Sequence, residues 1–466
     1  MINAGSRTAS SAGLSSYTTT TNQVADSGTV DIGQHYFAVS TNTTVTIQST
    51  APVATESGQQ GQFTVFRTGP TTSALPVFYN VGGTAVPGTD YQALSGNVTI
   101  DSGNSSQNIT VTPIANNTVT YDKTVTASLI LTNTYFVGSP GQATLTIQDI
   151  DRSSVVPVGV ASVSGPSGID YHPVNSSLIV ARGDTLGTDK NFKRVDSNGL
   201  VSNWTTLTGL GFTDDMGNQG EIKVGIVKIT TNNWTQGDMY FGTGQPGKIG
   251  KISADGSTVV NTNWATLTNA TQGVSETHVF LGGFYLDQTG VWNGDLIVVS
   301  GSGGVWRVTA STNATKVAQI NDPLGNAIGL EGALSVPNDP AKYGPWAGKI
   351  LTCAEATGLV FAIDTNGVAT PYNLGATEPE DVLLIPSGQL FYMLDAFTAP
   401  QVNKVAQAVF ASFAGDVLLV NELVSLGQCS DPALYIVHWD GGRFVVQEIP
   451  LPGAWEHATF APIDIH

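Results

Sequence analysis

Three glutamates in this chain occupy equivalent positions in three similar segments. Glu331, Glu380 and Glu456 each precede a proline by six residues, in GLEGALSVP, PEDVLLIP and WEHATFAP. Each stands where an apolar strand is expected to begin, and Glu221, before IKVGIV, is a fourth candidate. Carboxylates gathered at one place repel one another unless a cation or a shared proton compensates. If these strands converge, the sequence predicts a divalent metal or a polar ligand between them.

The glutamates lie in a repeating pattern that begins near residue 155. Segments 283–320 and 333–374 each contain four short apolar strands in the same order, with an aromatic residue and a glycine before the second strand. Weaker copies begin at 168, 222 and 380, and a partial one covers 414–449. A repeat of this length is typical of a β-propeller. Residues 153–466 fit roughly six blades, although five or seven also fit, and HATFAPI at the end is expected to be an innermost strand that closes the ring.

Innermost strands surround the axis of a propeller, so equivalent positions at their starts meet at one mouth of the channel. The glutamates would then hold an axial metal or ligand, with His278 and His457 as neighbouring candidates. The alternative is that each glutamate binds backbone amides of the next blade and holds the ring together. The sequence leaves both interpretations open.

This region is similar to six-bladed propellers of the gluconolactonase and NHL type, through PEDVLLIPSGQLFYML and the Asn-Gly turn of FAIDTNGVATPY. The resemblance implies a metal-dependent lactonase, in which Glu331 would belong to a catalytic metal site, but no asparagine partners can be assigned. The motifs G-x-S-x-G and H-E-x-x-H and a phosphate-binding loop are absent from the sequence.

The first third of the chain has a different pattern. Six runs alternate apolar with polar residues between Gly, Pro, Asn or Asp turns, as the strands of a β-sandwich do: FTVFRTG, LPVFYNVGG, GNVTIDSG, QNITVTPI, KTVTASLILT and QATLTIQD. With the GTDY turn and the closing D-x-D, residues 54–151 resemble a Calx-beta domain. The resemblance implies an immunoglobulin-like sandwich that serves as a structural or adhesive module of extracellular proteins and often binds calcium.

Calcium prefers six to eight hard oxygen ligands, which a sandwich supplies where carboxylates converge on loops at one end. The predicted ligands are the acids at strand ends and turns: Glu56, Asp90, Asp122, Asp149 and Asp151. Asn116 and Asn117 stand where the family carries acids, and Lys123 adds a positive charge. We therefore expect one or two weakly bound calcium ions at most. The alternative is that these acids only cap turns, and it stays open.

Composition narrows the function further. Only 12% of the 466 residues are charged, against roughly 25% in an average soluble protein, and the net charge is −18. Nucleic-acid binding is excluded because it needs clustered Lys and Arg, whereas the 18 present are scattered. The sequence contains no apolar run of about 18 residues that could cross a membrane. An acidic, lysine-poor chain fits a calcium-rich extracellular or cell-surface setting.

Residues 1–50 are expected to form an arm, with a Ser/Thr-rich start and two short strands in TVDIGQHYFAVS and TTVTIQST. It is either a disordered tail or an assembly arm that adds strands to a neighbouring subunit's sheet.

Trp204, Trp234 and Trp264 recur at intervals of 30 and would either cover blade edges or bind sugar rings. Two cysteines, Cys353 and Cys429, form either one bridge or two buried thiols.

The sequence thus predicts an all-β chain with an arm (1–50), a sandwich (51–152) and a propeller (153–466). The function that we expect is structural or adhesive: a surface protein that self-assembles into a layer or filament, or presents its propeller to another surface protein, with calcium-assisted stability. The alternatives are a metal-dependent lactonase-like hydrolase and a carbohydrate-binding propeller with glycans as partners.

Overall fold

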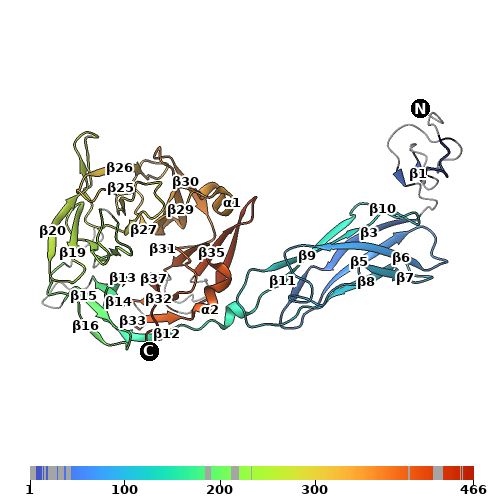
Figure 1. Ribbon diagram of the computed structural model, residues 1–466, viewed down its shortest axis with the longest axis horizontal. Helices are drawn as coiled ribbons and strands as arrows, with labels where there is room; N and C mark the ends of the chain where they lie inside the picture. Colours follow the sequence, from blue (N-terminus) through green and yellow to red (C-terminus); the bar gives the residue numbers. More distant parts are fainter. Residues whose placement is uncertain are drawn as a thin grey trace. The chain divides into compact units, whose positions relative to one another are not determined.

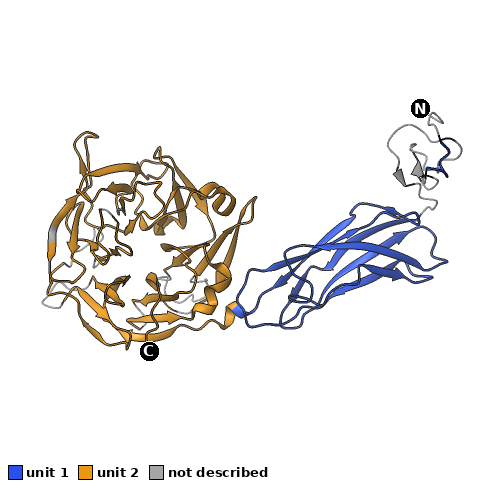
Figure 2. Cartoon of the chain, in the orientation of Figure 1, with its two compact units in different colours: residues 1–151 blue, residues 152–466 orange. Residues whose placement is uncertain are grey.

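The computed structural model describes residues 7–12, 14, 17–18, 29, 36–37, 43–183, 190–210, 220–231, 233–396, 399–422, 434–451, 453 and 455–466. The chain divides into two compact units, Met1–Asp151 and Arg152–His466 (Figure 2). Both are built mainly from strands (Figure 1), so the predicted all-β class is confirmed. No helix within the described ranges is long and apolar enough to cross a membrane.

The first unit contains a sandwich of two sheets. One has the order β10 (Phe136–Val137), β3 (Thr44–Ala51), β5 (Gly61–Thr68) and β8 (Ser106–Val111). The other has the order β4 (Val53–Thr55), β11 (Gln142–Gln148), β9 (Lys123–Leu129), β6 (Leu75–Gly82) and β7 (Asn97–Ile100). All six predicted strands are present.

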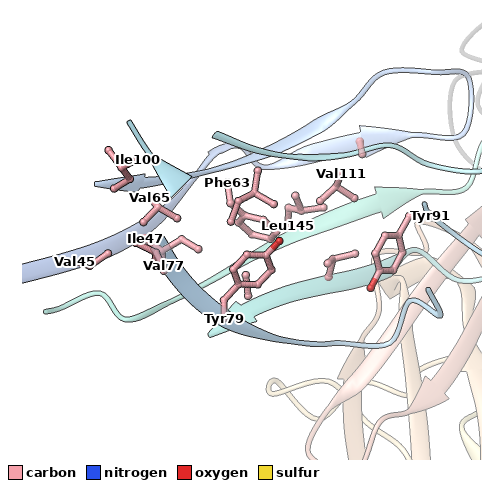
Figure 3. Packing of buried hydrophobic residues seen from close by; sticks show 14 of the residues in the cluster. Val45, Ile47, Phe63, Val65, Val77, Tyr79, Tyr91, Ile100, Val111 and Leu145 are labelled. Atoms are coloured by element: carbon pink, nitrogen blue, oxygen red, sulfur yellow. The ribbon is translucent and has the colours of Figure 1, made fainter. Parts of the chain in front are cut away.

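The core of the sandwich lies between these sheets. In β6, Leu75, Val77 and Tyr79 are buried and alternate with exposed residues, because successive side chains of a strand point to opposite faces. They pack with Phe63 of β5 in the other sheet and with Leu145 of β11 (Figure 3). The alternation seen in the sequence therefore identifies the buried face correctly.

One predicted boundary needs correction. The segment TTVTIQST was expected to belong to the arm, but β3 pairs with β5 over its length, and Val45 and Ile47 are fully buried in the core. Its alternating pattern does not tell whether a strand joins its own sheet or a neighbour's. The other expected arm strand, at 29–40, lies mostly outside the described residues; within it β2 (Tyr36–Phe37) pairs with β1 (Tyr17–Thr18).

The second unit is a propeller with six four-stranded blades among the described residues. Four blades are made of consecutive strands, from the axis outward. They are β13 (Pro166–His172), β14 (Ser177–Arg182), β15 (Phe192–Val195) and β16 (Val201–Asn203); β17 (Val224–Ile226), β18 (Met239–Gly242), β19 (Lys248–Ile252) and β20 (Val259–Thr266); β23 (Gly283–Leu286), β24 (Leu296–Val299), β25 (Gly304–Val308) and β26 (Ala314–Gln319); and β27 (Glu331–Ser335), β28 (Ile350–Ala354), β29 (Leu359–Ile363) and β30 (Ala369–Asn373).

The last two blades exchange strands. One contains β31 (Pro379–Leu384), β34 (Val417–Asn421), β35 (Leu434–Trp439) and β36 (Phe444–Ile449), and the other contains β37 (Trp455–Ala461), β32 (Leu390–Asp395), β33 (Gln401–Val405) and β12 (Val158–Ser162). EDVLLIPSGQLFYML was interpreted as the start of one blade, which is wrong, because β31 and β32 lie in different sheets. The pattern of two apolar runs around a Ser-Gly turn is the same for a hairpin and for a crossing between blades.

The ring closes as predicted through its last strand, which is innermost. The same blade contains β12, a strand from the beginning of the unit, which pairs with β33 at the edge opposite β37. The blade is thus built from both ends of the unit, which fixes the ring and covers a sheet edge that would otherwise be free. The remaining elements are short: the hairpin β21 (Thr268–Asn269) and β22 (Val274–Ser275), the helices α1 (Pro340–Tyr343) and α2 (Gln407–Phe410), and the 3-10 turns η1 (Asp151–Ser154), η2 (Gly344–Trp346), η3 (Glu355–Thr357) and η4 (Ala411–Phe413).

The recurring tryptophans do not form an exposed platform. Trp234 is only 4% exposed and donates through its indole N–H to the Gly294 carbonyl at 2.8 Å, while Trp264 packs on the same cluster and Trp204 is half-buried. Because Trp234 is buried, the sugar-platform interpretation is wrong for it, and covering of blade edges by the three tryptophans stays a prediction. Cys353 is fully buried in β28, and Cys429 lies outside the described residues.

Candidate functional site

The sandwich brings three of its predicted calcium ligands together. Glu56 follows β4 and Asp149 follows β11, and these strands run parallel with Thr55 paired to Gln148, so both acids leave the sheet at the same end. Asp151, two residues further on, joins them. Ligand oxygens of Glu56, Asp149 and Asp151 all lie within 4.8 Å of one another. We call these three residues the sandwich cluster.

The sandwich cluster is short of positive charge. Glu56 is 8% exposed, and its Oε1 accepts a hydrogen bond of 2.6 Å from the Asn116 amide, whereas its buried Oε2 has no hydrogen-bond partner. Burial, and then the charges of Asp149 and Asp151, raises the pKa of Glu56 to about 7. Burial and Asp149 also raise the pKa of Asp151. Such a group of hard oxygens with an unsatisfied buried carboxylate atom fits calcium.

The other two predicted ligands have separate roles. Asp122 is adjacent, and its Oδ1 accepts a hydrogen bond of 3.1 Å from the backbone N–H of Asp149. Asp90 binds the ammonium of Lys123 at 2.7 Å and accepts the N–H of Val86 at 2.7 Å. The lysine that was expected to repel calcium is thus paired with an acid outside the sandwich cluster.

On the propeller axis, the three glutamates with the six-residue spacing do converge. Glu331 is the first residue of β27, and Glu380 and Glu456 are the second residues of β31 and β37. These strands are innermost in their blades (Figure 1), so their starts meet around the axis. Glu221, just before β17, is the fourth member, as the sequence suggested.

Between the four carboxylates lies a residue that the sequence interpretation missed, Lys223. Its ammonium contacts Glu221 at 2.7 Å, Glu456 at 2.8 Å and Glu331 at 3.3 Å. It also donates a hydrogen bond to Glu380. Lys223 is 1% exposed, and although burial opposes its charge, the four carboxylates raise its pKa. The available signal was a lysine inside the apolar run IKVGIV, since a buried lysine needs a partner.

Three of these four carboxyl groups have raised pKa values. Burial and the charge of Glu331 raise the pKa of Glu380. Burial and the charge of Glu221 raise the pKa of Glu456. For Glu221, burial opposes ionisation, but Lys223 and a hydrogen bond with Glu456 lower the pKa. Burial raises the pKa of Glu331 to about 8 despite the nearby ammonium of Lys223.

Two further glutamates extend this group. Burial, followed by the charges of Glu380 and Glu221, raises the pKa of Glu422 to about 10. Burial raises the pKa of Glu355 as well. We call these six glutamates and Lys223 the axial cluster: Glu221, Lys223, Glu331, Glu355, Glu380, Glu422 and Glu456.

Glu221, Glu380 and Glu456 are a poor fit to a divalent ion, because the Lys223 ammonium contacts all three carboxylates. Metal binding by Glu331, Glu380 and Glu456 stays a prediction. His457 points elsewhere, with its Nε2 at 3.3 Å from Asp381. His278 accepts the N–H of Phe280 at 3.1 Å and is not a member of the acidic groups with metal-like spacing. The described contacts of the glutamates are with Lys223, whereas the expected bonds to backbone amides of the next blade stay a prediction.

Comparison with known proteins identifies the family of the sandwich. Residues 40–151 match the family model of the Calx-beta domain. This match confirms the resemblance, and the matched region begins before β3. The solved apo-form Calx CBD1 domain is 22% identical, with a TM-score of 0.21, and the match covers 23% of this chain and 98% of that one. None of the curated proteins matches the chain.

Two further solved structures match most of the chain. Virginiamycin B lyase from Staphylococcus aureus is 12% identical with a TM-score of 0.35, covering 80% of this chain and 89% of that one. A protein of unknown function from Bacteroides thetaiotaomicron is also 12% identical, with a TM-score of 0.37, and the match covers 89% of this chain and 92% of that one. The fold and its sites define an all-β protein with a Calx-beta domain followed by a six-bladed propeller.

Proposed function

We propose that this protein is an extracellular surface protein with a structural or adhesive role, in which a calcium-binding sandwich is joined to a propeller held rigid by its axial cluster. The observation that carries the proposal is the sandwich cluster, where Glu56, Asp149 and Asp151 converge and the buried Glu56 Oε2 has no hydrogen-bond partner. A buried carboxylate left in that condition is costly unless a proton or a cation neutralises it.

A bound calcium ion would supply the positive charge that the sandwich cluster lacks. Glu56 and Asp149 would bring ligands from the ends of β4 and β11, and Asp151 one from η1. Asn116 orients the Glu56 carboxylate, and the Asp122 carboxylate fixes the backbone of Asp149. Ligands from separate strand ends make calcium a link between them, so its binding stabilises the sandwich.

The chemistry of the sandwich cluster supports an extracellular location for the protein. Three carboxylates with few neutral oxygen ligands favour a weak site, which fills at the millimolar calcium concentrations typical of extracellular modules. The acidic, lysine-poor composition supports the same location. The axial cluster supports a structural role for the propeller, since its carboxylates bind Lys223 and a lactonase-type metal would have to replace that lysine.

Self-assembly is the finer part of the proposal. β3 is already paired within its own sandwich, so we assign strand addition to a neighbouring subunit to residues 1–42. Light scattering and negative-stain imaging of the full chain in calcium and in EGTA test this, with a chain that lacks residues 1–42 as the control. Polymers that dissolve on chelation and fail to form without the arm support assembly. A monomer under all conditions contradicts assembly but leaves calcium binding to be judged by titration.

A further inference from the structure

The propeller contains a cavity distinct from the axial cluster. Its volume is about 270 Å³, and it lies further along the innermost strands than the glutamates, between residues such as Ile226 of β17, Leu384 of β31 and Thr459 of β37. None of the axial-cluster residues lines it. Its volume equals that of about nine water molecules, which suits a ligand the size of one sugar ring.

The charged groups of this cavity are already paired. Asp170 accepts hydrogen bonds from Lys228, from the Thr459 hydroxyl at 2.9 Å and from the Ile226 N–H at 2.8 Å. Asp381 accepts the Val382 N–H at 2.8 Å and faces His457 Nε2 at 3.3 Å. A charged ligand would find no unpaired counter-charge among these groups, so the cavity favours a neutral one.

Other polar groups of the cavity have no side-chain hydrogen bond to the described part of the protein. They are the Tyr285 hydroxyl and the amides of Gln288 and Gln389, of which Gln288 is exposed and the other two are half-buried. Phenol and amide groups both donate and accept hydrogen bonds. Phe284 and Leu286, each 8% exposed, add an apolar wall. Apolar walls with a few convergent polar groups are typical of small-molecule sites.

We propose that this cavity binds a neutral, polyhydroxylated small molecule, of the class of a single sugar unit. Hydroxyls of such a ligand match the three free donor and acceptor groups, and its C–H face matches the apolar wall. The site would make the propeller a glycan-binding module, through side chains other than the recurring tryptophans. It is independent of calcium binding in the sandwich.

Saturation-transfer NMR and isothermal titration calorimetry of the full chain with methyl β-D-glucopyranoside and methyl α-D-mannopyranoside test the proposal. At least one of them is expected to bind, and Tyr285→Phe and Gln389→Leu are each expected to weaken binding about three- to tenfold, the effect of one lost hydrogen bond. Gln407→Leu removes an exposed amide outside the cavity and is the matched control. Unchanged melting temperatures confirm that the variants are folded.

Several results would overturn this assignment. The first is the absence of saturation transfer from both glycosides. The second is equal binding by the wild type and by whichever of the two cavity variants is folded. The third is binding of glucuronic acid, glucosamine or cyclohexanol that is as strong as that of the glycosides, or stronger. The first removes the site, the second moves it elsewhere, and the third shows that the cavity selects charge or apolar surface instead of hydroxyls.

Discussion

Replacing Lys223 by methionine tests the axial cluster most sharply, because the new side chain is nearly as long and has no charge. The four carboxylates that contact the ammonium would lose their counter-charge. Removing one partner from a buried ion pair costs about 3–5 kcal/mol. For a unit of about 300 residues, with an unfolding entropy of about 2.1 cal/mol/K per residue, this lowers the melting temperature by about 5–8 °C.

Differential scanning calorimetry at pH 8 and at pH 5 measures this effect. The loss is expected to be smaller at pH 5, where the carboxyl groups take up protons and need less positive charge. Arg443→Met, which breaks an exposed ion pair with Asp440, is the control, and it should leave the melting temperature nearly unchanged. If Lys223→Met melts with the wild type at pH 8, the axial cluster is not held by the lysine.

Three more predictions follow from the described charges. Glu56→Gln should raise the melting temperature of the sandwich in EGTA, because it removes a buried charge. The variant should also lose the increase in melting temperature that calcium gives the wild type. Calorimetry with and without calcium measures both changes in melting temperature. Calcium should bind more weakly below pH 7, since protons compete for Glu56, whose pKa is raised to about 7, and titrations at pH 6 and pH 8 measure the difference. The pKa values of Glu331 and Glu422 are raised to about 8 and about 10, so above pH 4.5 the folded propeller binds more protons than the unfolded chain. The stability of the propeller should therefore be highest in mild acid and should fall as the pH rises toward 8 and 10. A melting temperature that rises between pH 5 and pH 9 would contradict this prediction.

Much of the axial cluster could be predicted from the sequence because its glutamates repeat. Glu331, Glu380 and Glu456 share one spacing to a proline, and strands that occupy equivalent places in a ring bring equivalent residues together. Lys223 occurs once, so no repeat marks it, and its burial depends on the carboxylates that surround it in space. Glu355 and Glu422 were missed because each follows the second strand of its blade, β28 or β34, and the other four blades have no glutamate at that position.

The strand arrangement was predictable where neighbours in the sequence are neighbours in the sheet. The four consecutive blades meet this condition, and in the described sandwich the pair β6 and β7 alone does. The pairing of β12 with β33 and of β32 with β37 joins segments far apart in the chain, which no local pattern reports. In the sandwich, Asp90 was grouped with the calcium ligands because its pairing with Lys123 is also a matter of tertiary contact.

Calcium titration of the full chain by isothermal calorimetry, with wild type and Asp151→Asn compared, tests the central claim most directly. We expect wild type to bind about one ion per chain weakly, as a site with three carboxylates should, and the variant to lose most of that affinity. The absence of a calcium signal in the wild type, or an isotherm that the substitution leaves unchanged, would contradict a calcium-binding sandwich.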